Sequence, residues 1–396
     1  MNVWQGEEVK VFISAGEASG DLYGSYLTKA IKKEIPRAIF WGLGGHNMAK
    51  AGVSLLMYST HKGAIGVVEA LKILPSSLIA LFRVKKHLAT NPPHILILIN
   101  AGAFNLRVGR WVKKYLQIPI LYFIPPGSWK RQVGNNVIRL KQSADKFVCI
   151  FPWNQKALRE KGLDAYFFGH PLLDILHKED KKIAREKLQL QETLTLGLLP
   201  GSRLQEIRHI LPTLLQTVPI LRKKLPRLQF VLAPPIHSLP FLPKCLPKGW
   251  RISQDALVSD SDIVHLRIGQ SWEVMNASDA LIVTSGTATL ESAIFETPLI
   301  VIYKGSPLSH LEYHLRALNL PFISLPNIIL DRKEFPELIQ EQAIPPLIAN
   351  LAYQLLTNQS LRDRQFELFR EIKRSLGDKG AFQKTALLVK KMVMRK

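Results

Sequence analysis

Three segments of the chain repeat one order: a short apolar run, a turn that contains glycine, and a helical stretch. They begin at Val9, Thr195 and Leu281. Apolar runs of this length are typical of buried strands, and a strand, a glycine turn and a helix open each half of a doubly wound parallel sheet. A chain of 396 residues is also longer than one ordinary core. The sequence therefore predicts two Rossmann-like α/β domains.

Other apolar runs complete this pattern. We expect further strands at 38–43, 94–99, 119–124, 146–151, 165–168, 229–233 and 298–303. We expect helices at about 22–33, 180–188, 270–278, 347–358 and 360–394, and a loop over the proline-rich segment 234–247. The predicted organisation is a first domain of residues 1–172, a second of residues 173–358, and C-terminal helices at 359–396 that pack back on the first domain. A cleft between two such domains is the expected ligand site.

The charge of the chain constrains its partners. The formal net charge is +22, and so basic a surface indicates an anionic partner such as nucleic acid, anionic lipid or a phosphorylated substrate. Because the basic residues are scattered and no nucleic-acid-binding motif is present, we expect no nucleic acid. Segment 64–86 interleaves apolar and basic residues. It is expected to be either a core helix or an amphipathic helix on an anionic membrane surface.

Several classes of protein are excluded by what the sequence lacks. The two cysteines, Cys149 and Cys245, form no metal-binding or disulfide pattern, which favours a reducing compartment and no bound metal. The first ten residues contain Glu7 and Glu8 and no apolar core, so we expect no signal peptide. No run of 18 apolar residues occurs, so we expect no membrane-spanning helix.

The stretch from Leu281 to Ala293 has the features of a nucleotide site. Gly286 allows a tight turn and close approach of a ligand. Ser285 and Thr287 stand at a helix start, where free N–H groups and the helix dipole favour phosphate. Glu291 lies one helical turn further, where a carboxylate can accept hydrogen bonds from two ribose hydroxyls. An ordinary capped helix after a strand explains this stretch equally well.

Turns elsewhere carry further candidates. Arg203 follows Gly201 and Ser202 after a predicted strand, where an arginine beside free helix N–H groups makes a good diphosphate clamp. Glu17 is an acid at the carboxyl end of the first strand. The strand at 94–99 delivers Asn100 to the same edge of the sheet, where ligand sites of α/β proteins lie. His170 also follows a strand, close to the predicted domain boundary.

A series of motifs runs in order along nearly the whole chain. They are AGEASGD at 15–21, GLGGHNM at 42–48, GVVEALKILP at 66–75, FN at 104–105, GHPLLD at 169–174, LLPGSRLQEI at 198–207, SGTATLE at 285–291 and SLPNII at 324–329. In this order they resemble the motifs of the lipid-A-disaccharide synthase family, GT-B glycosyltransferases of the bacterial envelope. The resemblance covers roughly residues 11–390, and no single motif in it would be specific alone.

The resemblance implies transfer of a sugar from UDP-2,3-diacylglucosamine to 2,3-diacylglucosamine 1-phosphate, with release of UDP and without a cofactor or metal ion. It also implies association with the inner membrane from the cytoplasm, and a homodimer is among the expected partners. The residues expected to hold UDP are Gly201, Ser202, Arg203, Ser285, Gly286, Thr287, Glu291 and Asn327. Those expected at the acceptor are Glu17, Ser19, Gly20, Asp21 and His170.

One departure from the family pattern concerns the chemistry. Family members usually carry an IDAPDFN-like run where this chain has INAGAFN at 99–105, so Asn100 replaces the aspartate expected to be the general base. Asparagine cannot take a proton at neutral pH. The loop PPGSWKR at 125–131 also contains fewer tryptophans than the family pattern. Three hypotheses stay open. The first is a synthase, in which Asn100 marks a lost base and turnover is slow or absent, or in which Glu17 or Asp21 is the base instead. The second is another UDP-sugar transferase or epimerase of GT-B build that acts on a different glycolipid, and the third is a non-catalytic nucleotide- or glycolipid-binding protein.

Overall fold

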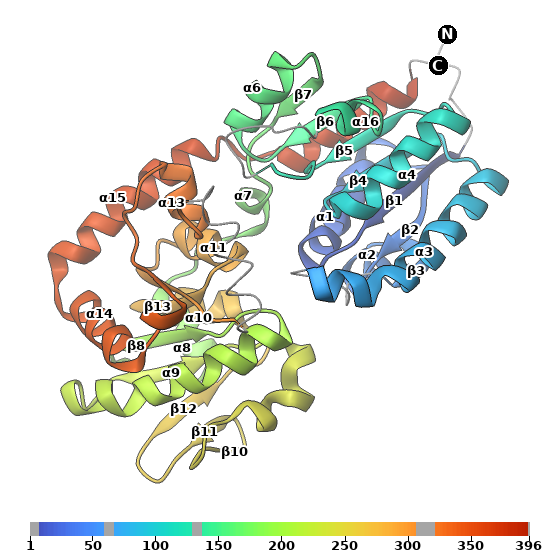
Figure 1. The fold of residues 1–396 in the computed structure, drawn as a ribbon. Coiled ribbons are helices and arrows are strands. Elements are labelled where there is room, and N and C mark those ends of the chain that lie inside the picture. Colours follow the sequence, from blue (N-terminus) through green and yellow to red (C-terminus); the bar gives the residue numbers. More distant parts are fainter. Residues whose placement is uncertain (1–7, 59–66, 129–136, 306–320, 395–396) are drawn as a thin grey trace. The chain divides into compact units, whose positions relative to one another are not determined.

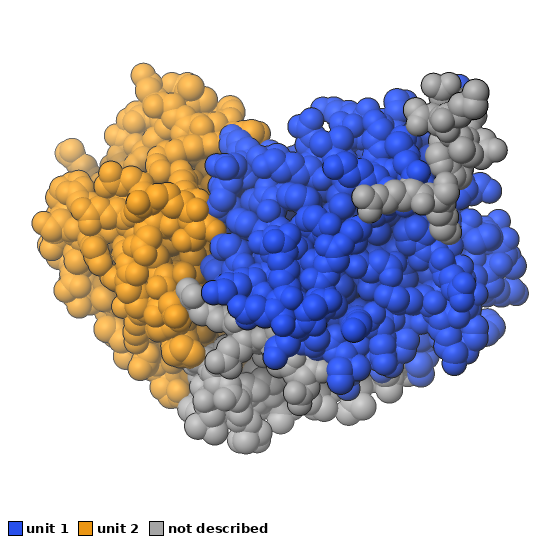
Figure 2. Space-filling model, turned by 90° about the horizontal axis from the view of Figure 1, so that it is seen from above, with its two compact units in different colours: residues 1–175, 376–396 blue, residues 176–375 orange. Residues whose placement is uncertain are grey.

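Two separate β-sheets organise the chain in the computed structural model, which describes residues 8–58, 67–128, 137–305 and 321–394 (Figure 1). Each sheet belongs to one compact unit. Unit 1 contains Met1–Ile175 and Leu376–Lys396, and unit 2 contains Leu176–Ser375 (Figure 2). Residues 64–66 and 129–131, which belong to the predicted amphipathic segment and the aromatic loop, lie outside the described residues.

The sheet of unit 1 has seven strands in the order β3-β2-β1-β4-β5-β6-β7, and all neighbours are parallel. Their order reverses between β1 and β4, as in doubly wound nucleotide-binding sheets. Strands β4 and β5 are buried along their whole length because both faces of a parallel sheet are covered by helices. The strands are β1 Val9–Ala15, β2 Ala38–Gly44, β3 Val53–Tyr58, β4 Ile95–Ile99, β5 Ile120–Phe123, β6 Lys146–Cys149 and β7 Asp164–Phe167.

Helices of unit 1 follow the strands, and the last helix of the chain joins them. α16 packs along α1, although the two lie at opposite ends of the sequence. Phe382 of α16 stacks on Tyr26 of α1, with ring centroids 5.5 Å apart. The helices are α1 Ala18–Glu34, α2 His46–Lys50, α3 Val67–Thr90, α4 Gly102–Tyr115, α5 Val137–Lys141, α6 Pro152–Glu160, α7 Leu172–Ile175 and α16 Ala381–Met394.

The sheet of unit 2 has eight strands in the order β10-β11-β12-β9-β8-β13-β14-β15. Pairing is parallel from β12 to β15, and β10 and β11 add an antiparallel edge. The strands are β8 Thr195–Leu199, β9 Gln229–Leu232, β10 Arg251–Ser253, β11 Ala256–Val258, β12 Ile263–Leu266, β13 Ala280–Thr284, β14 Leu299–Tyr303 and β15 Glu337–Ile339.

Helices of unit 2 include α15, which packs on α11, α13 and α14. Of the two helices described in the predicted segment 359–396, α15 therefore belongs to unit 2 and α16 to unit 1. The helical elements are α8 Lys181–Lys187, α9 Leu204–Lys224, the 3-10 helix η1 Ile236–Cys245, α10 Ser271–Ala277, α11 Thr287–Phe295, α13 Leu325–Leu330, the 3-10 helix η2 Gln340–Gln342, α14 Pro345–Thr357 and α15 Gln359–Ser375.

Several elements differ from the sequence-based prediction. The strands β3, β10, β11, β12 and β15 were not predicted, because they are short or have partly polar patterns. The predicted loop 234–247 contains η1, a 3-10 helix that tolerates prolines. The predicted single helix 360–394 is wrong. It divides at Gly377 and Gly380, both of which have positive φ angles (73° and 100°).

The GHPLLD motif holds the start of α16. Both oxygens of Asp174 accept N–H groups there, from Gly380 at 2.6 Å and from Phe382 at 3.1 Å. The backbone N–H of His170 donates to the carbonyl of Leu376 at 2.8 Å. At Gly169, a Cβ atom would lie 1.9 Å from the carbonyl oxygen of Asp378. Glycine is therefore required where these two distant segments meet.

We expect Gly169→Ala to destabilise unit 1 more than Gly162→Ala. Both glycines have positive φ angles (99° and 74°), but nothing lies within 4 Å of a Cβ added at Gly162. The control thus bears only left-handed backbone strain, about 1–2 kcal/mol, whereas Gly169→Ala adds an overlap that costs a further ~1–3 kcal/mol. Urea denaturation of the full chain measures both. Equal unfolding midpoints for the two variants would contradict the close contact with Asp378.

Candidate functional site

In unit 1, Glu17 and Asn100 follow the carboxyl ends of the neighbouring strands β1 and β4. The strands pair in register up to Ala15 and Ile99, and the side-chain amide of Asn100 donates to Oε2 of Glu17 at 3.2 Å. Both side chains are half-buried. The structure thus brings together the expected acid and the residue that replaces the family's aspartate.

The backbone around Asn100 has an unusual conformation. Asn100 and Ala101 both have positive φ angles (49° and 48°), a strained arrangement for residues other than glycine. The carbonyl of Asn100 accepts the hydroxyl of Tyr122 at 2.8 Å and the side-chain amide of Asn105 at 3.0 Å. Tyr122 is fully buried, and burial raises the pKa of its hydroxyl. It therefore acts as a permanent hydrogen-bond donor.

Asn105 is a residue whose role the sequence analysis missed. Its amide donates to the carbonyls of Ser14 at 3.2 Å and Ile99 at 3.0 Å, and its Oδ1 accepts the Ser14 hydroxyl at 2.7 Å. Asn105 is fully buried, so these bonds tie the ends of β1 and β4 together in a low-dielectric environment. The FN motif at 104–105 was the available signal, but it did not indicate a hydrogen-bonding role.

Asp21 is used inside the protein. Its Oδ1 accepts the N–H groups of Gly45 at 2.7 Å and Met48 at 3.0 Å, and its Oδ2 accepts that of Asn47 at 3.0 Å. Only 4% of Asp21 is exposed. The carboxylate therefore joins the AGEASGD motif to the start of α2. This gives Asp21 a structural role and makes it a poor candidate for a base, because both of its oxygens already accept backbone N–H groups.

The other acceptor-side candidates differ in exposure. Ser19 is half-buried in the first turn of α1, and Gly20 is buried there against Ala15 and Ile99. His170 is 2% exposed, and its Nδ1 accepts the N–H of Leu172 at 3.2 Å. Burial lowers the pKa of His170 to about 3. The imidazole is therefore neutral and packs inside unit 1, where its ring centroid lies 5.4 Å from that of Phe151.

In unit 2, a carboxylate of the chain itself accepts the N–H groups of the turn after β8. Oε2 of Glu206 accepts the N–H groups of Ser202 at 3.0 Å and Arg203 at 3.1 Å, and Oε1 pairs with the guanidinium of Arg203 at 2.8 Å. A Cβ at Gly201 would lie 2.5 Å from the same carboxylate. The N–H groups of Ser202 and Arg203 are therefore not free for a ligand, because Glu206 at the third helical position reaches back to them.

The turn after β13 is open by contrast. Ser285 is anchored, with its hydroxyl donating to the carbonyl of Ile323 at 2.8 Å. Gly286 has a φ of 154°, and a Cβ there would meet no atom within 4 Å. Among the described residues, no acceptor is found for the N–H groups of Gly286, Thr287 and Ala288 at the start of α11. This helix N-terminus can therefore receive an anion.

Glu291 lies one turn into α11. It is half-buried, and desolvation raises its pKa to about 7, although a hydrogen bond with Trp272 acts in the opposite direction. A carboxyl group with this pKa changes its charge near neutral pH. The open turn and Glu291 thus combine an anion site with a titratable hydrogen-bonding group on one short helix.

Asn327 has no hydrogen-bonding atom left for a ligand. Its amide donates to the carbonyl of Phe335 at 3.0 Å and to Glu337 at 2.9 Å, and its Oδ1 accepts the N–H groups of Glu334 and Phe335, both at 2.9 Å. Asn327 is fully buried. The predicted contact with UDP is therefore not available to its side chain, which instead connects α13 to the segment before β15.

The described residues also bear on membrane and metal binding. No helix among them is both long and apolar enough to cross a membrane. The same residues contain no group of three or more His, Cys, Asp or Glu side chains arranged to hold a metal ion.

Solved structures share the architecture of this chain. A Staphylococcus aureus MnaA–UDP co-structure aligns with a TM-score of 0.62 at 14% identity, over 96% of each chain. The calicheamicin glycosyltransferase CalG4 aligns with a TM-score of 0.58 at 13% identity, over 98% of this chain and 99% of that one. At such low identity these likenesses concern the fold alone, and the fold is GT-B, with two Rossmann-like units.

Sequence comparison shows which family the chain belongs to. A lipid-A-disaccharide synthase of Trichlorobacter lovleyi is 35% identical over 395 residues, covering 98% of each chain. That of a Synechocystis species is 33% identical over 395 residues, covering 96% of this chain and 97% of the relative. The family model described as lipid-A-disaccharide synthetase matches residues 11–392. Since this match spans nearly the whole length, the chain belongs to the lipid-A-disaccharide synthetase family.

Proposed function

We propose that this glycosyltransferase joins a 2,3-diacylglucosamine unit, carried by UDP, to 2,3-diacylglucosamine 1-phosphate in lipid A biosynthesis. The observation that carries the proposal is the open N-terminus of α11 with Glu291 one turn behind it. That pair suits a diphosphate and a ribose, and the relatives are named for the same synthesis. The proposal includes no resident cofactor or metal ion.

On the donor side, unit 2 binds UDP through backbone N–H groups at Gly286, Thr287 and Ala288. As the sugar leaves, negative charge grows on the diphosphate, and these preorganised N–H dipoles stabilise it. Arg203 contributes less than the sequence suggested, because its guanidinium is 42% exposed and already paired with Glu206. The ribose hydroxyls donate to the carboxylate of Glu291.

We expect the affinity for uridine to rise with pH through Glu291. Only the deprotonated carboxylate accepts both ribose hydroxyls, so a pKa near 7 predicts roughly tenfold tighter binding at pH 8 than at pH 6. Uridine is the probe because it has the ribose but no phosphate that titrates in this range. Saturation-transfer NMR measures the dissociation constants. Glu291→Gln should flatten the pH profile, and an unchanged profile in that variant would remove Glu291 from the ribose site.

On the acceptor side, Glu17 is the proposed general base. The acceptor hydroxyl oxygen forms a bond to the anomeric carbon, the bond from that carbon to the UDP oxygen breaks, and the hydroxyl proton passes to Glu17. Asn100 holds Oε2 of Glu17 through its amide and leaves the other oxygen available. Asp21, the alternative acid, has both oxygens occupied by backbone N–H groups. Glu17 therefore takes the place of the aspartate that Asn100 replaces.

We expect Glu17→Gln to lower turnover by ~10²–10⁴, the usual contribution of a general base, while UDP binding stays unchanged. UDP release from the two diacylglucosamine substrates measures turnover. Glu34→Gln is a matched control, because it removes a carboxylate at the far end of the same helix α1, and it should keep normal activity. The opposite pattern would refute this assignment: normal turnover in Glu17→Gln together with a gain in Asn100→Asp would identify Asn100 as a lost base.

For the membrane, we propose peripheral attachment to the inner membrane through α3, from the cytoplasmic side. Leu78, Ile79 and Phe82 are 51%, 55% and 70% exposed, and Arg83 and Lys86 are exposed beside them. Such apolar and basic side chains suit a surface of anionic lipid. Lys85 is a weaker candidate than the sequence suggested, because its ammonium lies over the Trp111 ring, 5.9 Å from the centroid.

We expect Phe82→Ser and the double variant Arg83→Gln/Lys86→Gln to reduce sedimentation with phosphatidylglycerol vesicles. Phe82→Ser removes apolar surface that the membrane would bury, and the double variant removes an attraction between charges that salt screens. Only the double variant should therefore reduce the salt sensitivity of binding. Ile236→Ser is the control, since Ile236 of unit 2 is 72% exposed and far from α3 in sequence. Equal binding to phosphatidylcholine and phosphatidylglycerol would contradict the electrostatic part.

A homodimer stays a prediction, which analytical ultracentrifugation of the full chain would test.

A further inference from the structure

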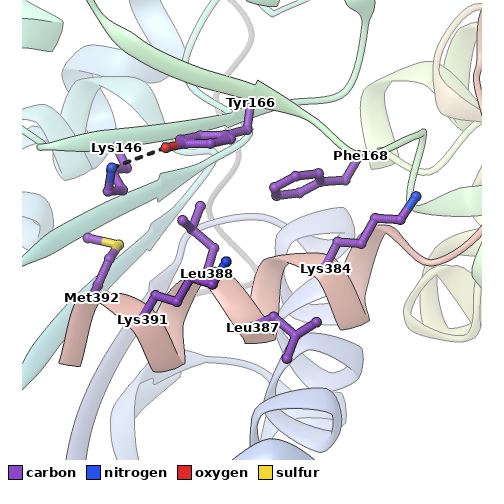
Figure 3. Close-up of a pocket in the computed structure, with 8 residues that line it drawn as sticks. All are labelled: Lys146, Tyr166, Phe168, Lys384, Leu387, Leu388, Lys391 and Met392. Atoms are coloured by element: carbon purple, nitrogen blue, oxygen red, sulfur yellow. Dashed lines mark hydrogen bonds between the residues drawn. The ribbon is translucent and has the colours of Figure 1, made fainter. Parts of the chain in front are cut away.

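A hollow of about 390 Å³ lies in unit 1 between β7 and α16 (Figure 3). Its volume falls within the range of small-molecule sites, roughly 300–1,000 Å³. Neither Glu17 nor Asn100 lines it. It is therefore separate from the residues assigned to sugar transfer.

One side of the hollow is a face of α16. Lys384, Leu387, Leu388 and Lys391 are spaced at i, i+3, i+4 and i+7, which places them on one side of a helix. The two lysines are therefore about 10 Å apart along the helix axis, with leucines between them. Leu387 is 40% exposed although it is apolar. This face offers an apolar middle with an ammonium group at each end.

The opposite side is aromatic and also cationic. Tyr166 of β7 and Phe168, which follows it, lie over α16 (Figure 3). Lys146 of β6 donates to the Tyr166 hydroxyl at 3.2 Å and forms an ion pair with Asp164. β7 is the last strand in the sheet order, so no further strand covers this edge. An occupant would contact two aromatic rings as well as the leucines.

The charges of the lining are all of one sign. Three lysines line the hollow and no acidic residue does. Within the described part of the chain, Lys384 and Lys391 make no ion pair, whereas the neighbouring Lys390 pairs with Glu34 at 3.5 Å. Apolar walls with unpaired ammonium groups complement a molecule that is apolar along its length and anionic at its head.

We propose that this hollow binds a single-chain anionic amphiphile, with its chain against Leu387, Leu388 and Phe168 and its phosphate or carboxylate head at Lys384 or Lys391. The site is independent of sugar transfer and of the exposed face of α3. It would bind such a molecule in a variant that lacks catalytic activity.

The test titrates the full chain with dodecyl phosphate, below its micelle concentration, by isothermal calorimetry. Two comparison ligands separate the parts of the proposal. Dodecyl maltoside has the chain without the charge, and inorganic phosphate has the charge without the chain. We expect both to bind more weakly than dodecyl phosphate. Equal affinity of the maltoside would overturn the role of the lysines, and equal affinity of inorganic phosphate would overturn the role of the apolar walls.

Variants locate the binding. Lys384→Gln/Lys391→Gln should weaken dodecyl phosphate binding by about two- to fivefold, as expected for the loss of one partly exposed ion pair at whichever lysine holds the head. Leu387→Asp should weaken it further, because the new carboxylate repels the anionic ligand. Lys379→Gln/Lys390→Gln removes two charges from the same segment outside the lining and should bind normally. Phe82→Ser and Glu17→Gln should also bind normally. No binding by the unmodified chain, an equal loss in the control pair, or a loss in Phe82→Ser would each overturn the proposal.

Discussion

The side chain of Asn105 sets the geometry on which the acceptor side of this protein depends. Its amide bonds three backbone carbonyls at the ends of β1 and β4, and its oxygen accepts the Ser14 hydroxyl. Because the Ser14, Ile99 and Asn105 groups are buried, each would be costly to leave unpaired. The bonds hold Asn100 in its left-handed conformation, and Asn100 in turn holds Glu17. The position of the proposed base thus depends on a residue that touches no substrate.

Two helix N-termini in unit 2 show how one carboxylate changes what a turn can do. Both follow buried parallel strands through a glycine turn with a positive φ angle. At α9, Glu206 fills the anion position and accepts the N–H groups itself. At α11, the equivalent region has no such acid, and the N–H groups at 286–288 have no acceptor among the described residues. Glu206 thus takes up two N–H groups of the turn before α9, whereas those at the start of α11 stay available to an anion.

The family motifs have structural reasons that differ from one to the next. AGEASGD and GLGGHNM are joined by Asp21, whose carboxylate accepts three backbone N–H groups. GHPLLD receives the C-terminal segment, and SLPNII contains Asn327, which is buried and fully hydrogen-bonded. Motifs of this kind look like ligand-binding sequences because they contain polar residues at strand ends. Buried polar residues that are hydrogen-bonded within the protein give the same pattern, and only the contacts separate the two cases.

The sequence alone determined the long, apolar strands in the parallel parts of both sheets, because burial on both faces requires unbroken apolar runs. It also determined which turns meet at the sheet edges, since parallel strands end on the same side, and it placed Glu17 and Asn100 together for that reason. Only the tertiary structure decided which polar side chains stay available. Backbone N–H groups already donate hydrogen bonds to the side chains of Asp21, Glu206 and Asn327. Some of these N–H groups are distant in sequence and others lie in a neighbouring turn, and the periodicity of a sequence does not encode such contacts. The same holds for α16, whose place along α1 depends on contacts between segments some two hundred residues apart, such as that of Asp174 with Gly380.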